Sequence, residues 1–210
     1  MLNKKARIAV FVSGGGTNLQ ALLDAQADGR LQSGEIVLVV SSKAGAYALT
    51  RAAEHGVASA VASRKALGSR EAVEAELERL LAEYRIDMII LAGYLSILSA
   101  AFTAKWPRRI LNVHPSLIPA FCGDGFYGLR VHEAALERGV KLTGATVHFV
   151  NEITDGGEII LQKAVPVLPG DTPEILQRRV MEQAEWQLLP AAAELVAQEI
   201  VQKGEPHGHL

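Results

Sequence analysis

The sequence predicts an α/β fold built on a doubly wound, mostly parallel sheet with one antiparallel edge. Apolar runs of strand type alternate with segments of helical periodicity along the chain. The first run passes through three consecutive glycines into a helix, and the last two runs are separated only by a polar loop, so they can pair as an antiparallel edge. Such an alternation favours parallel strands joined by right-handed crossovers, as in a Rossmann-like sheet.

Strands are predicted at residues 7–12, 35–40, 57–62, 88–91, 110–113, 146–150 and 158–165. Helices are predicted at 19–27, 46–54, 69–84, 99–105 and 131–138, and from 172 to about 202. Thr17 or Asn18 can act as the N-cap of the first helix, and Ser69 as the N-cap of the helix that begins there. Pro190 predicts either two segments or one kinked helix at the C-terminal end.

The length and the composition limit the function classes. At 210 residues the chain favours a single domain, residues 1–210, with a core from about 7 to 202 and a flexible tail at 203–210. Lys and Arg total 21 against 23 Asp and Glu, which gives no bulk electrostatic case for a nucleic-acid partner. One cysteine, Cys122, no signal-peptide pattern and no apolar run of membrane-spanning length together predict a cytoplasmic protein without a membrane partner.

Asn112 and His114 stand near the end of the predicted strand 110–113. Side chains two residues apart on a strand point to the same side, so the two polar groups face one space. Pro115 disfavours helix at His114 and ends the strand at the carboxyl edge of the sheet, where open α/β sheets bind ligands. Taken alone, the pair is also compatible with an amide bonded to a loop and a satisfied interior histidine.

The glycines at 14–16 form a second candidate site. Their backbone N–H groups can approach an anion at the start of the next helix. No Gly-Lys-Ser/Thr follows, and Leu19 occupies the third glycine position of the dinucleotide fingerprint. A small phosphate monoester therefore fits better than ATP or NAD, although a tight turn without a ligand is an equally open interpretation.

Other polar residues are weaker candidates. Ser116 and Cys122 do not sit in a nucleophile elbow. His148 shares a strand face with Thr146, so it lies either near the same cleft or in the core. Asp155 precedes two glycines in a loop that a structural turn would explain. No ligand cluster has the spacing of a metal site, so no metal is predicted.

Three segments together resemble a known family: SGGGTNLQALL at 13–23, ILNVHPSLIPAF at 110–121 and GATVHFVNEITDGGEIILQ at 144–162. They are similar to the phosphoribosylglycinamide formyltransferases, folate-dependent enzymes of purine synthesis, and the likeness covers roughly residues 7–190. It implies the formyltransferase fold and transfer of a formyl group from 10-formyltetrahydrofolate to the amine of phosphoribosylglycinamide. The Asn-x-His-Pro-Ser motif is shared by the wider formyltransferase group, whereas the glycine loop with Asn18 points to the phosphoribosyl substrate.

The resemblance also implies roles for individual residues. Asn112, His114 and Asp155 match a catalytic trio. Gly16, Thr17 and Asn18 would hold the substrate phosphate. Glu185 would lie near the substrate amine, although its spacing from Asp171 is about one residue longer than usual. The folate site would be lined by Arg70, Leu91, Leu95, Ser96, Ile97, Leu98, Asn112, Val150, Asn151, Glu152, Ile153, Thr154 and Asp155.

The implied chemistry is direct transfer, in which the amide of Asn112 and a protonated His114 stabilise the developing oxyanion and Asp155 pairs with His114. Three departures from the family pattern stand out. Ser96 replaces a common Arg that would contact the folate tail, the loop 122–128 is long, and Thr17 replaces the more frequent Ser.

Three other functions stay open at this stage. A formyltetrahydrofolate hydrolase shares the Asn-x-His and Asp signature but would carry an additional N-terminal domain, and a transfer-RNA formyltransferase would carry an additional C-terminal domain. A non-catalytic module that binds a phosphometabolite would keep the glycine loop and leave the trio idle. A homodimer is compatible with the sequence.

Overall fold

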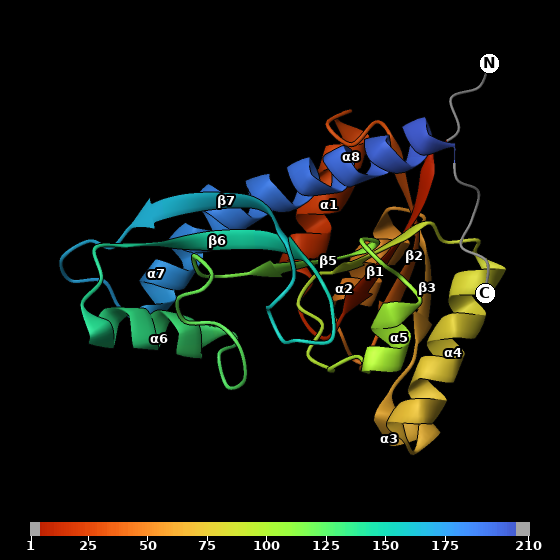
Figure 1. Ribbon diagram of the computed structural model, residues 1–210, viewed down its shortest axis with the longest axis horizontal. Coiled ribbons are helices and arrows are strands. Elements are labelled where there is room, and N and C mark those ends of the chain that lie inside the picture. Colours follow the sequence, from red (N-terminus) through yellow and green to blue (C-terminus); the bar gives the residue numbers. More distant parts are fainter. Residues whose placement is uncertain (1–4, 205–210) are drawn as a thin grey trace.

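A computed structural model describes residues 5–204, and in this part of the chain seven strands form one sheet in the order β3-β2-β1-β4-β5-β6-β7. The strands are β1 (Ala6–Val12), β2 (Gly34–Ser41), β3 (Ala58–Val61), β4 (Met88–Leu91), β5 (Ile110–His114), β6 (Leu142–Phe149) and β7 (Ile159–Pro166). The first five strands pair in parallel, and β6 and β7 add antiparallel pairs beside β5. The predicted mostly parallel sheet with an antiparallel edge is confirmed (Figure 1).

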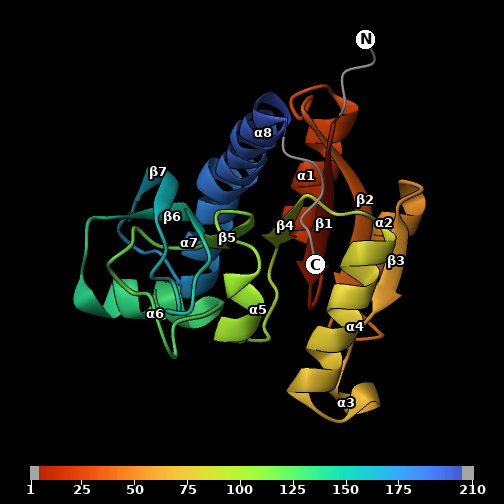
Figure 2. The same ribbon diagram turned by 45° about the vertical axis from the view of Figure 1, so that its right-hand side comes forward.

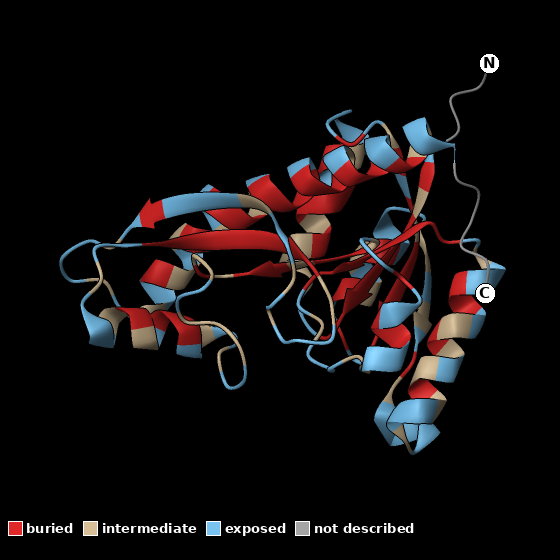
Figure 3. Ribbon diagram, viewed as in Figure 1, coloured by how far each residue is buried: buried red, intermediate tan, exposed pale blue. Residues whose placement is uncertain are grey.

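Helices cover both faces of the sheet (Figures 1 and 2). They are α1 (Thr17–Ala27), α2 (Ala48–Glu54), α3 (Arg64–Leu67), α4 (Arg70–Glu83), α5 (Ala100–Ala104), α6 (Leu129–Arg138), α7 (Pro173–Val180), the π-helix η1 (Met181–Glu185) and α8 (Trp186–Lys203). In β1, the alternate residues Ile8, Val10 and Val12 pack into the cluster beneath α1 and α8, whereas Ala9 and Phe11 pack into the cluster beneath α4 and α5. The strand is therefore buried on both sides, as its continuous apolar run predicts (Figure 3).

The start of α1 differs from the prediction. Its N-cap is Gly16, not Thr17 or Asn18, and no side chain caps the helix. Gly16 has φ 73°, and a Cβ there would lie 2.6 Å from Cβ of Ala48 in α2. Only glycine adopts this positive φ without strain and leaves room for Ala48, so the loop turns sharply at Gly16. The side chains of Thr17 and Asn18 therefore do not cap the helix. Ser69, by contrast, caps α4 as predicted by accepting a hydrogen bond from the N–H of Ala72.

The C-terminal helical region is irregular upstream of Pro190. Pro190 lies inside α8, and the irregular turn is η1, directly before α8. A π-turn closes its hydrogen bonds over five residues instead of four, so it holds one residue more than an α-turn. Glu185, for which the resemblance implies one additional residue after Asp171, is the last residue of η1. The predicted tail lies outside the described residues from position 205 on.

The carboxyl ends of β1, β4 and β5 lie at one edge of the sheet because these strands are adjacent and parallel. The sequence order reverses between β1 and β4, which is where ligands bind in such sheets. Within the described residues, none of the helices is long and apolar enough to cross a membrane.

Candidate active site

Two neighbouring strands carry the polar residues at this edge. Asn112 and His114 lie on β5, and antiparallel pairing places His148 of β6 opposite Asn112 and Thr146 opposite His114. The side-chain amide nitrogen of Asn112 lies 3.2 Å from Nε2 of His148. Sequence reasoning left His148 between the cleft and the core, and the alternation of Thr146 and His148 on one face was the available signal. The structure places His148 in the polar cluster.

Asp155 brings this cluster together. The loop after β6 folds back with Asp155 at φ 54°, and its side chain is 8% exposed. Its Oδ1 lies 3.5 Å from Nε2 of His148 and 3.5 Å from the amide nitrogen of Asn112, and its Oδ2 lies 3.5 Å from Nδ1 of His114. The structure therefore brings together the three residues that the resemblance implies as a trio, with His148 as a fourth member.

Backbone carbonyls fix the orientation of both histidines. Nε2 of His114 donates to the carbonyl oxygen of Phe121 at 2.8 Å, which turns Nδ1 toward Asp155. Nδ1 of His148 donates to the carbonyl oxygen of Phe149 at 2.8 Å, which turns Nε2 toward Asn112 and Asp155. Both rings are buried. Nδ1 of His114 is thus the ring nitrogen that has no backbone partner among the described residues and faces the Asp155 carboxylate.

The electrostatic environment favours a charged Asp155. Burial acts to raise the pKa of this carboxyl, but hydrogen bonds from His148 and from the Gly123 N–H, together with the charges of both histidines, outweigh it and hold the pKa below its ordinary value. The Gly123 N–H donates to Oδ2 at 2.9 Å, so the long loop 122–128 is tied to the cluster. Asp155 is therefore an anion at neutral pH, and in this form it can accept a proton.

A second buried carboxyl lies beside the glycine loop. Asn18, in the first turn of α1, donates its amide to Oε2 of Glu185 at 2.8 Å. Burial raises the pKa of Glu185 more than this hydrogen bond lowers it. Oδ1 of Asn18 is buried and has no hydrogen-bond partner among the described residues. Oδ1 of Asn18 and the carboxyl of Glu185 are therefore available as hydrogen-bond acceptors for a ligand.

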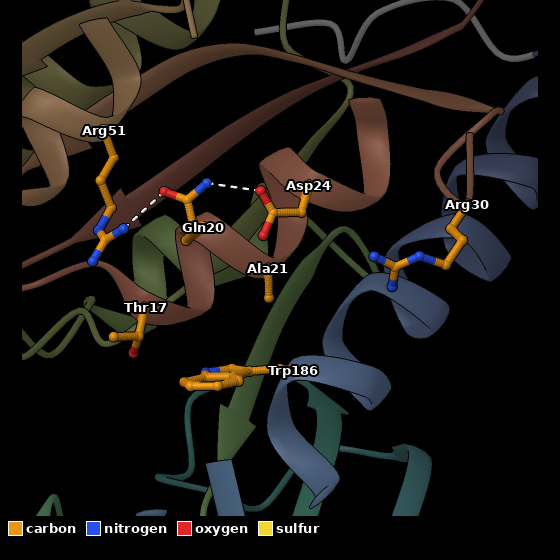
Figure 4. A pocket seen from close by; sticks show the side chains of 7 residues that line it. All are labelled: Thr17, Gln20, Ala21, Asp24, Arg30, Arg51 and Trp186. Carbon is orange, nitrogen blue, oxygen red and sulfur yellow. Dashed lines mark hydrogen bonds between the residues drawn. The ribbon is translucent and has the colours of Figure 1, made fainter. Parts of the chain in front are cut away.

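The glycine loop is linked to the loop after β4. Oγ of Ser13 accepts a hydrogen bond from the Leu95 N–H at 2.9 Å and lies 2.6 Å from Oγ of Ser42. The residues 92–99 are thus anchored to the loop that precedes α1. Of the predicted phosphate residues, Thr17 lines a cavity of about 310 Å³ between α1, α2 and α8 (Figure 4).

The predicted folate residues are distributed over several places. Leu91, Leu98 and Val150 belong to one apolar cluster. Leu95 and Ile97 are 61% and 69% exposed. Val150, Asn151 and Glu152 line a second cavity of about 280 Å³ with residues of α5 and of the segment between α5 and β5, whereas Arg70 and residues 95–98 are not part of its lining. The structure thus brings Leu91, Leu98 and Val150 together, whereas Leu95 and Ile97 stay on the surface.

A family model described as formyl transferase matches residues 6–193. The chain belongs to the formyl transferase family. Three formyl transferase relatives illustrate the similarity. A phosphoribosylglycinamide formyltransferase of Haemophilus influenzae is 41% identical over 88% of this chain and 84% of its own length. The trifunctional purine biosynthetic protein adenosine-3 of Gallus gallus is 47% identical over 96% of this chain.

The third relative is a solved structure, glycinamide ribonucleotide transformylase 1 from Symbiobacterium toebii. It is 45% identical, has a TM-score of 0.86 and is matched over 93% of this chain and 89% of that one. The formyltransferase fold is therefore confirmed. The chain spans about a fifth, 19%, of the length of the trifunctional relative. This formyl transferase matches the bacterial relatives over most of their length.

Proposed function

We propose that the chain transfers the formyl group of 10-formyltetrahydrofolate to the amine of 5′-phosphoribosylglycinamide, with formyl-phosphoribosylglycinamide and tetrahydrofolate as products, in purine biosynthesis. The observation that carries this proposal is the convergence of Asn112, His114 and His148 within 3.5 Å of the Asp155 carboxylate. An amide donor, an imidazole and an anion at one sheet edge are the groups that formyl transfer to an amine requires.

These groups have separate roles in the proposed reaction. 10-Formyltetrahydrofolate supplies the formyl group. As the substrate amine attacks its carbonyl carbon, negative charge develops on the formyl oxygen, and the Asn112 amide and Nδ1–H of protonated His114 donate hydrogen bonds to it. Asp155 stabilises the charge of His114 and accepts the proton that the amine loses, directly or through a water. The bond between the formyl carbon and the folate nitrogen then breaks, and that nitrogen takes up the proton that Asp155 accepted, directly or through a water.

The amine substrate is proposed to bind between the polar cluster and the glycine loop. Gly16, Thr17 and Asn18 would hold its phosphate at the start of α1. The unpartnered Oδ1 of Asn18 and the carboxyl of Glu185 supply acceptors for N–H or O–H groups. Both features support a small substrate that carries an anion at one end and hydrogen-bond donors at the other.

The folate side rests on the apolar cluster of Leu91, Leu98 and Val150, which suits a flat, largely apolar ring system. The remaining contacts in the proposal come from Asn112, Arg70, Leu95, Ser96, Ile97, Asn151, Glu152, Ile153, Thr154 and Asp155. Because Leu95 and Ile97 are exposed without a ligand, we expect them to become covered when the co-substrate binds. Ser96 supplies a hydroxyl but no charge for the folate tail.

One assay tests the function against its alternatives. The protein is mixed with 10-formyltetrahydrofolate, with and without phosphoribosylglycinamide, and release of tetrahydrofolate is followed by absorbance. Release that depends on the amine supports the transferase. Release without the amine would instead indicate a formyltetrahydrofolate hydrolase, and no release in either case would indicate a module that binds a phosphometabolite. A burst of formylated Ser116 or Cys122 would contradict direct transfer.

We further propose that the whole chain acts as a single formyltransferase domain, that it acts in the cytoplasm, and that it needs neither a metal ion nor a nucleic-acid or membrane partner. Sedimentation of the purified protein tests the homodimer that the sequence leaves open.

A further inference from the structure

The three residues proposed to hold the substrate phosphate carry no positive charge. Gly16, Thr17 and Asn18 offer N–H groups and a hydroxyl, yet a phosphate ester carries up to two negative charges near neutral pH. Charge-assisted contacts are about twice as strong as neutral ones, so a cation beside the loop would contribute strongly to binding. Two arginines, Arg30 and Arg51, line the cavity of about 310 Å³ that Thr17 also lines.

The cavity is bounded by α1, α2 and α8 (Figure 4). Its lining consists of Thr17, Gln20, Ala21, Asp24, Arg30, Arg51 and Trp186. Thr17 and Trp186 are the sequence neighbours of Asn18 and Glu185, the buried pair beside the glycine loop. Arg30 and Arg51 bring positive charge to this lining, and their hydrogen-bond partners differ.

Arg51 is held against the glycine loop. Its Nε donates to the carbonyl oxygen of Gly15 at 2.9 Å, its Nη1 donates to Oε1 of Gln20 at 2.8 Å, and its guanidinium lies 5.0 Å from the ring centre of Tyr47. No carboxylate lies within ion-pair distance of it in the described part of the chain, and its Nη2 has no hydrogen-bond partner there. Figure 4 shows this guanidinium extending from α2 toward Thr17.

Arg30 is held differently. Its guanidinium makes hydrogen bonds to both carboxylate oxygens of Asp28, at 2.7–3.0 Å, and the pair is about half exposed. Figure 4 places Arg30 on the opposite side of the cavity from Thr17. The one carboxylate in the lining, Asp24, accepts a hydrogen bond from Nε2 of Gln20 at 2.8 Å, which keeps it on the α1 turn beyond Gln20. The charge of Arg51 is therefore the one left available beside the glycine loop.

We propose that Arg51 is the counter-cation for the phosphate of the amine substrate, and that this phosphate extends from the glycine loop into the cavity between α1, α2 and α8. This inference rests on the proposed function for the identity of the substrate. The hydrogen bonds to Gly15 and Gln20 orient the guanidinium before the substrate arrives, so little side-chain entropy is lost on binding. The closely packed Gly16 and Ala48 bring α2, and hence Arg51, up to the loop.

The test compares two substrates and three variants. Phosphoribosylglycinamide and its dephosphorylated ribonucleoside are assayed with wild-type protein, Arg51→Met, Arg51→Lys and the control Arg30→Met. We expect Arg51→Met to lower kcat/KM for the phosphorylated substrate about 10- to 100-fold, mainly by raising KM. This is the factor expected when a hydrogen bond to a charged group is lost. The same variant should leave the ribonucleoside reaction and the KM for folate unchanged. Arg51→Lys should lie between the two, and Arg30→Met should match wild type.

Other outcomes would overturn the inference. Equal losses on both substrates would mean that Arg51 only shapes the glycine loop. An unchanged Arg51→Met, or a loss confined to Arg30→Met, would place the charge elsewhere. If wild-type protein shows no amine-dependent release of folate, the proposed function fails, and calorimetric titration with ribose 5-phosphate then tests Arg51 alone. Weaker binding to Arg51→Met than to wild type, with no change for ribose, supports the inference, and equal binding contradicts it.

Discussion

The two buried carboxyls of the site lie in opposite environments. Asp155 is surrounded by two imidazoles, an amide and a backbone N–H, and its pKa is lowered. Glu185 is buried with a single hydrogen-bond donor, Asn18, and its pKa is raised. In the proposed reaction, the anion thus lies where a proton is accepted, and the carboxyl that is easily neutralised lies beside the proposed substrate site. The pKa of the same functional group is lowered in one place and raised in the other because its neighbours differ.

The largest expected effect comes from removing the anion. Asp155→Asn keeps the shape of the side chain but loses the charge that His114 and His148 face. We expect kcat to fall about 10²- to 10⁴-fold, the range for loss of a general acid or base. The neighbouring Asp124→Asn, which loses a carboxylate bonded to Thr154, serves as the control. Full turnover by Asp155→Asn at every pH would remove Asp155 from the mechanism.

A smaller effect is expected from the amide donor. Asn112→Ala should lower kcat about 10²- to 10³-fold, as for other oxyanion donors, with little change in either KM. His148 contacts the Asn112 amide, so it is expected to act through the orientation of Asn112. His148→Phe should therefore lower kcat less than Asn112→Ala, and in the double variant it should add nothing. Additive losses in this cycle would show that His148 acts independently.

In the glycine loop, close packing is expected to determine how much a substitution lowers the stability of the fold. Gly16→Ala meets Cβ of Ala48 at 2.6 Å and requires a left-handed backbone, which costs about 1–2 kcal/mol before the clash is counted. Gly14→Ala is the matched control, since a Cβ there has no atom within 4 Å. Urea denaturation should show a clear loss of stability for Gly16→Ala and almost none for Gly14→Ala. Equal stabilities would contradict the tight contact of the loop with α2.

The smallest expected effect is on stability, which should depend on pH in opposite ways for Glu185 and Asp155. The raised pKa of Glu185 means that the folded state holds its proton more tightly, so this contribution to stability is full below the ordinary value of 4.5 and is lost as pH rises above it. Glu185→Gln should therefore be more stable than wild type by a few degrees in Tm at pH 8 and no more stable at pH 4. A wild-type advantage that grows with pH would contradict the raised pKa.

Asp155 has the reverse dependence. Its lowered pKa contributes stability above the ordinary value of 3.8, and that contribution is lost as pH falls below it. The stability difference between wild type and Asp155→Asn should therefore shrink toward low pH. The two variants, measured in one series of thermal melts, would show opposite slopes.

The sequence predicted the centre of the sheet well because β1, β2 and β4 are short, mainly apolar runs that can be recognised without tertiary information. It also placed Asn112 and His114 at a strand end. It could not decide the position of His148, because the pairing of β5 with β6 joins residues 36 positions apart. The N-cap at Gly16 was missed because it depends on contact with Ala48, a feature of α2.

The exposed folate residues show a different limit. Leu95 and Ile97 are apolar and stand 61% and 69% exposed, so a pattern of apolar residues did not reveal whether they are core or binding surface. The short helix α3 was also missed, because its four residues carry no full helical period. Local patterns predict what is buried in the sheet, whereas the loops depend on contacts between distant segments.

The π-turn η1 has a consequence for how this part of the chain tolerates insertions and deletions. In a regular helix, one additional residue would rotate everything after it by about 100°, so Glu185 would turn away from Asn18. The wide turn absorbs that residue, and the 2.8 Å contact is kept. Removal of one residue within Met181–Ala184 would convert the turn to a regular α-helix with Glu185 still opposite Asn18. The helix can thus change its length by one residue without changing which side chain faces the site.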